Sequence, residues 1–301
     1  GHLGNVAEKF AAQYNGKHMT FDPTEQGVLH GAVKSVLGQD QLPTFDISNT
    51  ATILSFGADW LGTWGSPAQF GVKYGEFRSQ SDRGYLIHTE PRMSLTAAAA
   101  DLWLAPKPGT EGDLALGIAS IIINEGLVTQ ENISAFNAVV PGGLDGYSAL
   151  QVSSRTGISS DRIEKAARHF ANHMPAVAFG GGSAGAHTNG SFNLEAIYAL
   201  NILVDAVDAN GGITPNPESA IDGLPSSSAG APFQTWEAEL AQWRAGNVET
   251  VIIRGADIVH GMPNSVAIRE ALQNVPNVIV FGTIHDDTMD FADLILPEQT
   301  V

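Results

Sequence analysis

The chain has 301 residues, of which 43% are apolar and 16% charged, and its 15 lysines and arginines are outnumbered by 32 aspartates and glutamates. The formal charge of −17 excludes the basic footprint that nucleic acid or an anionic lipid surface requires. No apolar run approaches the roughly 18 residues of a membrane span. The chain has no cysteine, so this segment holds no disulfide, cysteine-ligated metal, iron–sulfur ligation or thiol nucleophile.

Apolar strands alternate with amphipathic helices along the chain. Continuous apolar runs predict strands over residues 52–56, 85–88, 102–104, 176–179, 251–253, 278–281 and 294–296. Apolar residues at helical spacing predict helices over residues 5–14, 26–37, 114–125, 161–173, 194–208, 236–245 and 265–273. We expect Asp161 to cap the fourth of these helices. Strands without polar alternation are typical of parallel sheets that are covered on both faces.

The predicted fold class is therefore α/β, with two Rossmann-like parallel-sheet units. Residues 1–212 are expected to form the first unit with a helical lead-in, and residues 213–301 a linker and the second unit. The linker prediction rests on a Gly-, Pro- and Ser-rich stretch over residues 211–233. Because the chain stops directly after an apolar strand-like run, we expect a segment truncated at both ends.

The two predicted units repeat one order of features. In each, a strand ends in Gly-Ala-Asp, at residues 57–59 and 255–257, and a proline follows. Further on, each has a threonine and then Ala-Asp-Leu-x-Leu, at residues 100–104 and 292–296. A glycine at the end of a strand lets backbone approach a ligand closely, and the amides that follow favour a phosphate. The alternative is that each glycine only makes the turn from strand to helix.

Four segments in series resemble the molybdopterin oxidoreductase superfamily. Residues 86–92, which end in Glu-Pro-Arg, resemble that family's Asp-Pro-Arg strand end. Residues 96–111 are similar to its alanine-aspartate strand and Pro-Gly-Thr-Asp loop, residues 255–264 to its Gly-Ala-Asn-Pro loop, and residues 281–297 to its last strand before a C-terminal barrel. The resemblance covers about residues 50 to 301.

This resemblance implies two pseudo-symmetric halves that each hold one molybdopterin guanine dinucleotide. The glycine loops would lie beside the dinucleotides, and carboxylates at strand ends would accept from ribose or guanine. The cofactor-binding residues that it implies are Gly57, Ala58, Asp59, Glu90, Arg92, Thr110, Glu111, Gly255, Asp257 and His285.

The sequence departs from the family pattern at the carboxylates and at the metal. Glu90 and Glu111 stand where the family has aspartate, and the added methylene moves each carboxylate by about an ångström. The family's molybdenum ligand lies upstream of the first glycine loop, where residues 44–48 lack the surrounding pattern. Its four-cysteine iron–sulfur motif would precede Gly1. We therefore expect no catalytic residue and no metal ligand in this segment.

One branch of the superfamily is more similar than the rest. Residues 55–67 and 90–96 resemble the molybdopterin-like, iron–sulfur large subunit of alternative complex III. The resemblance implies a scaffold without molybdenum, partnered by other subunits of a bacterial, membrane-bound, quinol-oxidising complex. The segment would be soluble, at the periplasmic face and peripheral to the membrane. The alternative is the cofactor-binding part of an active molybdenum oxidoreductase.

Other motifs support different hypotheses. Gly180-x-Gly182-x-x-Gly185 follows a strand and precedes a helix, which is the dinucleotide fingerprint of an NAD(P)-linked dehydrogenase. His285-Asp286-Asp287 suggests a metal cluster or, since no second histidine stands at ligand spacing, a solvated loop. Trp60 and Trp64 are spaced for packing on one helix face or for a docking surface.

Overall fold

The computed structural model describes residues 2–23, 26–39, 42–140, 142–214 and 230–299. Most of the predicted linker lies outside these residues. The chain divides into a larger unit, residues 28–222, and a smaller unit made of residues 1–27 and 223–301. The grouping of the first residues with the last ones differs from the predicted boundary at residue 212.

The larger unit is built on a four-stranded parallel sheet in the order β4-β3-β2-β5. The strands are β2 (Thr52–Phe56), β3 (Tyr85–Thr89), β4 (Leu102–Leu104) and β5 (Ala176–Gly180). The helices are α2 (Gln26–Leu37), α3 (Pro67–Arg78), α4 (Leu95–Ala99), α5 (Glu111–Asn124), α6 (Gln130–Val139), α7 (Ala149–Thr156), α8 (Ser160–Asn172) and α9 (Gly190–Leu203). Short β1 (Thr44–Phe45) pairs antiparallel with β6 (Ile213–Thr214).

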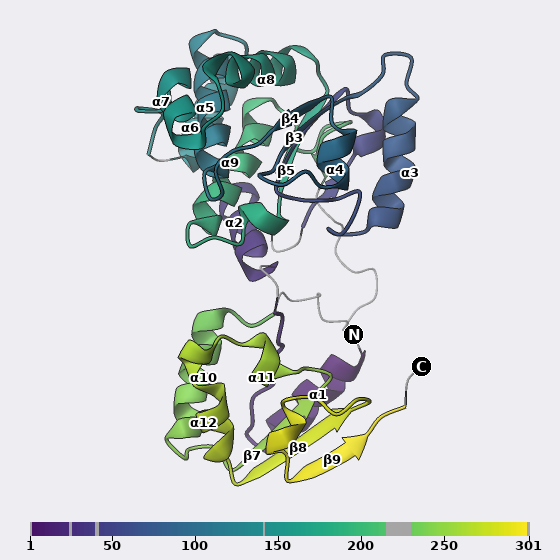
Figure 1. The fold of residues 1–301 in the computed structure, drawn as a ribbon, viewed down its shortest axis with the longest axis vertical. Coiled ribbons are helices and arrows are strands. Elements are labelled where there is room, and N and C mark those ends of the chain that lie inside the picture. Colours follow the sequence, from purple (N-terminus) through teal and green to yellow (C-terminus); the bar gives the residue numbers. More distant parts are fainter. Residues whose placement is uncertain (1, 24–25, 40–41, 141, 215–229, 300–301) are drawn as a thin grey trace. The chain divides into compact units, whose positions relative to one another are not determined.

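Helices cover both faces of this sheet. α3 and α4 lie on one side, and α5, α8 and α9 on the other (Figure 1). The chain runs outward from β2 to β3 to β4 and then returns to place β5 on the opposite side of β2. Because crossovers are right-handed, this reversal moves the later helices to the second face. The continuous apolar strands are thus explained by burial on both faces.

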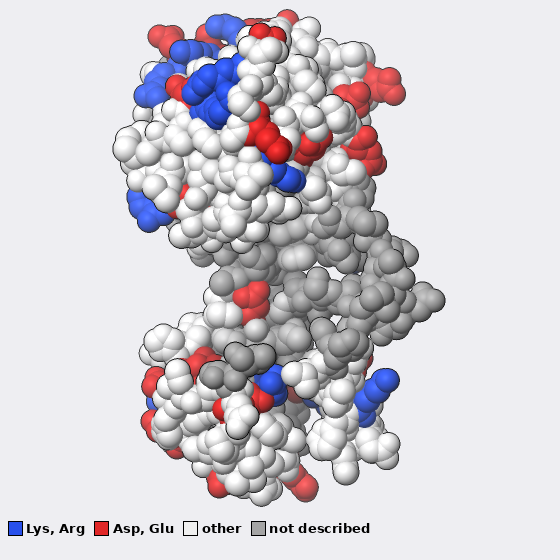
Figure 2. Space-filling view, turned by 90° about the vertical axis from the view of Figure 1, so that its right-hand side faces the viewer, with Lys and Arg blue, Asp and Glu red and all other residues white. Residues whose placement is uncertain are grey.

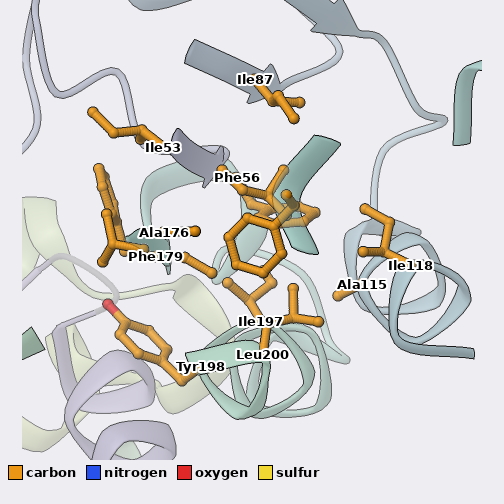
Figure 3. Packing of buried hydrophobic residues seen from close by; sticks show 14 of the residues in the cluster. Ile53, Phe56, Ile87, Ala115, Ile118, Ala176, Phe179, Ile197, Tyr198 and Leu200 are labelled. Atoms are coloured by element: carbon orange, nitrogen blue, oxygen red, sulfur yellow. The ribbon is translucent and has the colours of Figure 1, made fainter. Parts of the chain in front are cut away.

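The core of the larger unit joins the sheet to α5 and α9. Phe56 of β2 meets Ile197 of α9 and Ala115 and Ile118 of α5 (Figure 3). Phe179 of β5 is in register with Ser55 and points to the other face of the sheet. All of these side chains are buried. Each Å² of apolar surface removed from water stabilises the fold by about 25 cal/mol, so this layer helps to hold the sheet in place.

The tryptophans that follow β2 belong to this core. Trp60 is fully buried and Trp64 is 8% exposed. Both pack on Phe179, at ring-centroid distances of 5.9 Å and 6.0 Å. They lie in the turns between β2 and α3, not in a helix. Both the docking surface and the helix-face packing proposed from their spacing are therefore wrong.

The other differences from the predictions lie at helix ends and in helices that were not predicted, which are α3, α4, α6, α7 and α11 (Ile258–Gly261). Ser159, not Asp161, occupies the N-cap of α8, and Asp161 lies in the first turn, where its charge still favours the helix. α9 ends at Leu203 because Asp205 and Asp208 adopt left-handed backbone conformations. α3 was not predicted, since glycines interrupt its apolar residues and only Phe70 and Phe77 are buried.

The smaller unit has a three-stranded parallel sheet in the order β7-β8-β9. The strands are β7 (Thr250–Arg254), β8 (Asn277–Gly282) and β9 (Leu294–Pro297), and the helices are α1 (His2–Gln13), α10 (Phe233–Arg244), α11 (Ile258–Gly261) and α12 (Ile268–Gln273). Val251 and Ile253 face a cluster around Trp236, whereas Ile252 is 48% exposed. Among the described residues, this sheet is therefore covered on one face, not on both as predicted.

Residues before the larger unit complete the smaller core. Met19 and Phe21 pack on its cluster, with the Phe21 ring edge-on to Trp236 at 6.0 Å. The Ala231 amide donates to the Thr20 carbonyl at 2.9 Å. These contacts are the physical reason why the lead-in groups with the C-terminal residues. None of the helices in the described ranges is both long and apolar enough to cross a membrane.

Three rings stack where α8 ends beside β3. The His169 ring lies 3.9 Å from the Tyr85 ring and 4.0 Å from the His173 ring. The buried Nε2 of His169 has no partner among the described residues. Burial, followed by the nearby His173, lowers the pKa of His169 to about 4. The folded protein therefore holds this imidazole neutral.

We expect His169 to make the larger unit acid-sensitive. The pKa of His169 is about 4 in the folded protein and about 6.5 in the unfolded chain. Its contribution to the free energy of unfolding is therefore fully present above pH 6.5 and is lost as the pH falls towards 4. Since the ring is partly exposed, about 1 kcal/mol is expected. Urea unfolding at pH 7 and pH 4.5 should show a smaller acid loss for His169→Gln than for wild type. An equal loss in wild type and His169→Gln would contradict the prediction.

Candidate functional site

The carboxyl ends of the parallel strands in the larger unit meet at one edge of the sheet. The loops after β2, β3 and β4 carry Gly57, Glu90 and Glu111, so the structure brings these sequence-predicted residues to a common edge. The Gly57 amide donates to the Thr89 carbonyl at 2.7 Å, which ties the first two loops together. This edge is where open α/β sheets bind ligands.

Gly57 has a left-handed backbone, with φ of +64°. A Cβ atom added to it would lie 2.4 Å from the Ala184 amide nitrogen and 2.7 Å from the Gly181 carbonyl oxygen. The glycine is therefore required by the approach of the loop after β5. Its neighbour Ala58 is fully buried, so its side chain is not exposed to a ligand.

Asp59 is held by the segment before β4. Its carboxylate accepts from the Thr96 hydroxyl at 2.8 Å and from the Thr96 amide at 3.1 Å, and Asp59 is 8% exposed. The Thr96 hydroxyl in turn accepts from the Leu61 amide at 3.0 Å. The described contacts of Asp59 thus fix the shape of the glycine loop.

A buried chain of hydrogen bonds reaches Glu90 from the core. The Trp60 indole donates to Ser55 Oγ at 3.2 Å, Ser55 Oγ lies 2.7 Å from His88 Nδ1, and His88 Nε2 lies 3.2 Å from Glu90 Oε2. Because indole can only donate, the Ser55 proton is free to go to His88 Nδ1. Nε2 then carries the imidazole proton and donates to Glu90.

This chain fixes the carboxylate of Glu90. Burial alone would raise the pKa of Glu90, but hydrogen bonds from His88 and Ser94 and the charge of Arg92 outweigh burial and lower it. Arg92 Nη2 lies 3.6 Å from Glu90 Oε1, and its side chain is 71% exposed. Sequence analysis missed Ser55 and His88, which are polar residues inside an apolar strand pattern.

Glu111 lies beside α9. It is fully buried at the start of α5, and its Oε2 lies 3.4 Å from Asn193 Nδ2. Its Oε1 has no hydrogen-bond partner among the described residues. Burial raises the pKa of Glu111, against hydrogen bonds from nearby backbone amides. Thr110 precedes it at the N-cap and donates to the Lys107 carbonyl at 2.7 Å.

The smaller unit repeats the glycine loop. Gly255 has φ of +62°, and no atom lies within 4 Å of the position that its Cβ would take. Asp257 accepts from the Thr288 hydroxyl at 2.7 Å, as Asp59 does from Thr96. His285 lies on the loop after β8 and is exposed, and its Nδ1 lies 3.8 Å from Asp290 Oδ1.

A second aspartate is also repeated. The Asp101 carboxylate accepts from the Leu86 amide at 2.8 Å, and the Asp293 carboxylate accepts from the Val278 amide at 2.7 Å. The strand order β2-β3-β4 likewise matches β7-β8-β9. The internal repeat predicted from the sequence is therefore present in topology and in side-chain contacts.

The glycines of the fingerprint have packing roles. A Cβ on Gly180 would lie 3.0 Å from Ile197, and one on Gly182 would lie 2.5 Å from the Gly57 carbonyl oxygen. α9 begins only at Gly190, so the glycine loop does not open directly into the helix. These contacts explain the pattern without a pyrophosphate. The described residues contain no group of three metal-ligating side chains.

The displayed face of the molecule carries red and blue side chains interspersed between white areas (Figure 2). In the upper part of this view, several blue side chains gather with red ones beside them, so the displayed surface is mixed in charge.

Comparison with known proteins explains this fold and repeat. The family model for molybdopterin oxidoreductase matches residues 4–301. The chain belongs to the molybdopterin oxidoreductase family. The predicted resemblance is thus confirmed.

Several relatives fit this assignment. The menaquinone reductase molybdopterin-binding-like subunit of Nitratidesulfovibrio vulgaris is 25% identical over 305 residues, which cover 99% of this chain and 43% of that protein. The arsenate respiratory reductase molybdopterin-containing subunit of Chrysiogenes arsenatis is 31% identical over 210 residues, which cover 61% of this chain and 24% of that protein. The structure of acetylene hydratase from Pelobacter acetylenicus superposes with a TM-score of 0.71 at 19% identity, covering 90% of this chain and 44% of that one, and confirms the fold. The chain spans less than half the length of these relatives.

The residues at the larger sheet edge do not fit a molybdopterin dinucleotide. The face of Gly57 is taken by protein backbone, and the Glu111 carboxylate is covered by Asn193. Glu90 and Arg92 alone retain groups of the kind that bind a nucleotide. In the smaller unit the Gly255 loop is open, but its Asp257 is bonded to Thr288.

Proposed function

We propose that this chain is the molybdopterin-fold segment of a quinol-oxidising electron-transfer subunit of the alternative complex III type, in which the fold is a scaffold that holds no molybdenum. The observation that carries the proposal is the burial of Glu111 against Asn193. The carboxylate at this loop would have to leave a fully buried position to receive a guanine. This movement would break the hydrogen bond from buried Asn193, and leaving a buried polar group unpaired costs about 1–3 kcal/mol.

Similarity to other proteins supports a role in a quinone-linked complex. The relative whose match covers almost the whole chain is described as molybdopterin-binding-like and belongs to a menaquinone reductase. From the resemblance to alternative complex III, we propose that the chain works beside iron–sulfur and membrane subunits at the periplasmic face of a bacterial membrane. In this role it would contribute surfaces and rigidity and would perform no turnover by itself.

Metal analysis of the intact purified subunit tests the scaffold. We expect no stoichiometric molybdenum, because backbone of the loop after β5 covers Gly57 and the Glu111 carboxylate is buried. An arsenate respiratory reductase produced in the same host is the matched control for cofactor supply. One molybdenum per subunit would overturn the proposal.

A second candidate is the cofactor-binding part of an active molybdenum oxidoreductase. It is favoured by Glu90 and Arg92, which lie at the end of β3 with an ionised carboxylate and an exposed guanidinium. Relatives described as molybdopterin-containing also support it. The same metal analysis separates the two candidates.

A further inference from the structure

The order of the strands locates the place where this sheet should bind a ligand. In the order β4-β3-β2-β5, the chain moves in one direction from β2 to β4 and then reverses to β5. The loops after β2 and β5 therefore leave the sheet towards opposite faces. In open α/β sheets, the crevice between two such loops is the ligand site.

In this protein the chain itself fills that crevice. The Gly181 amide donates to the Phe56 carbonyl and the Ser183 amide to the Gly57 carbonyl, both at 3.1 Å. A Cβ on Gly57 or Gly182 would lie within 2.5 Å of backbone atoms of the opposite loop. The two loops are thus in backbone contact, with no space for a ligand between them.

The residues around this contact hold it in place. Asn193 Nδ2 donates to the Ala184 carbonyl at 3.1 Å, while its Oδ1 accepts from the Gly112 amide at 3.0 Å. On the other side, a Cβ on Gly181 would lie 2.4 Å from the indole nitrogen of Trp64. The loop after β5 is therefore clamped between the start of α5 and a buried tryptophan.

The internal repeat provides the comparison. Gly255 occupies the place of Gly57, has the same backbone conformation, and has nothing within 4 Å of its Cβ position. The shared conformation comes from the loop itself. The close contact at Gly57 is made by the loop after β5, and the described residues of the smaller unit contain no strand that corresponds to β5.

We infer that residues 181–184 are an internal plug, which occupies the switch-point crevice and closes it to nucleotide ligands. The plug gives a structural reason for the scaffold proposed above and takes its functional meaning from that proposal. The occupant is a segment of the same chain. The crevice is therefore closed when the chain folds, and no partner protein is needed to close it.

Amide hydrogen exchange on the full chain tests the plug directly. We expect the amides of Gly181 and Ser183 to exchange within about tenfold of those in β2, since both would open only with the core. Excess GDP, the probe for a pyrophosphate nucleotide, should leave their rates unchanged. Exchange about a thousandfold faster than in β2, or slowing by GDP, would overturn the inference.

Paired glycine variants add a second measurement. Gly182→Ala should speed exchange at Ser183 by about a hundredfold relative to β2, because its Cβ meets the Gly57 carbonyl. Gly255→Ala, the matched control, should not affect Ser183. Unchanged exchange in Gly182→Ala would overturn the plug. If that variant does not fold, the wild-type rates with and without GDP decide. If the amides of Gly181 and Ser183 exchange rapidly and the subunit contains no molybdenum, the plug is refuted and the scaffold is not. If these amides are protected and the subunit contains stoichiometric molybdenum, the scaffold is refuted and the plug is not.

Discussion

Replacing Asp59 by alanine should destabilise the larger unit by about 3 kcal/mol. The carboxylate accepts from both the hydroxyl and the amide of Thr96, and both donors are buried. Alanine would leave these donors without a partner and without water. Urea unfolding followed by tryptophan fluorescence measures the loss, since Trp60 directly follows the loop.

Matched variants separate the hydrogen bonds from the charge. Asp59→Asn keeps an acceptor oxygen, so we expect a loss of about 1 kcal/mol. Asp257→Ala removes the equivalent bond to Thr288 in the smaller unit, where the carboxylate is less buried, and about 1.5 kcal/mol is expected. A double-mutant cycle of Asp59→Ala with Thr96→Val should show coupling of at least about 1 kcal/mol. Additive losses would show that the Asp59–Thr96 bond is not the cause.

Asn201→Leu should cost about 3 kcal/mol. β5 is an edge strand, and fully buried Asn201 of α9 takes the place of a neighbouring strand. Its Oδ1 accepts from the Ala178 amide at 2.9 Å, and its Nδ2 donates to the Ala178 carbonyl at 2.7 Å. Leucine has a similar volume but leaves both backbone groups of Ala178 unpaired.

Asn124→Leu is the control for this substitution. Asn124 is exposed on α5, and its side-chain amide donates to Ser120 Oγ at 3.2 Å. Its replacement should cost less than about 1 kcal/mol. Similar losses from the two variants would mean that the edge of β5 does not depend on Asn201.

Sequence patterns predicted the sheets because the strands are apolar over most of their length, although only those of the larger unit are buried on both faces. They also predicted the repeat, since Gly-Ala-Asp and Ala-Asp-Leu-x-Leu place the same contacts in both units. α3 was missed because Gly71 and Gly75 dilute its apolar stripe. The lead-in was placed with the wrong unit, since nothing in the sequence of residues 19–21 indicates a core that is completed by residues beyond 230.

The candidate site was predictable in position but not in detail. The glycine after β2 marks the sheet edge. A glycine at this position allows close approach either by a ligand or by another loop, and only the position of residues 181–184 shows which of the two is present. His88 and Ser55 gave no signal, because their hydrogen bonds depend on the pairing of β2 with β3. Whether Glu90, Arg92 or His285 contacts a nucleotide remains a prediction.

The discontinuous smaller unit imposes an order on biosynthesis. Its N-terminal residues emerge from the ribosome first, but Thr20 and Phe21 have no partner until Ala231 and Trp236 are made. The larger unit can complete its core in the meantime. Closing such a long loop in an unfolded chain costs several kcal/mol of entropy, by about (3/2)RT ln n. A larger unit that is already compact reduces this cost, so variants that delay its folding should also trap the two ends of the chain apart.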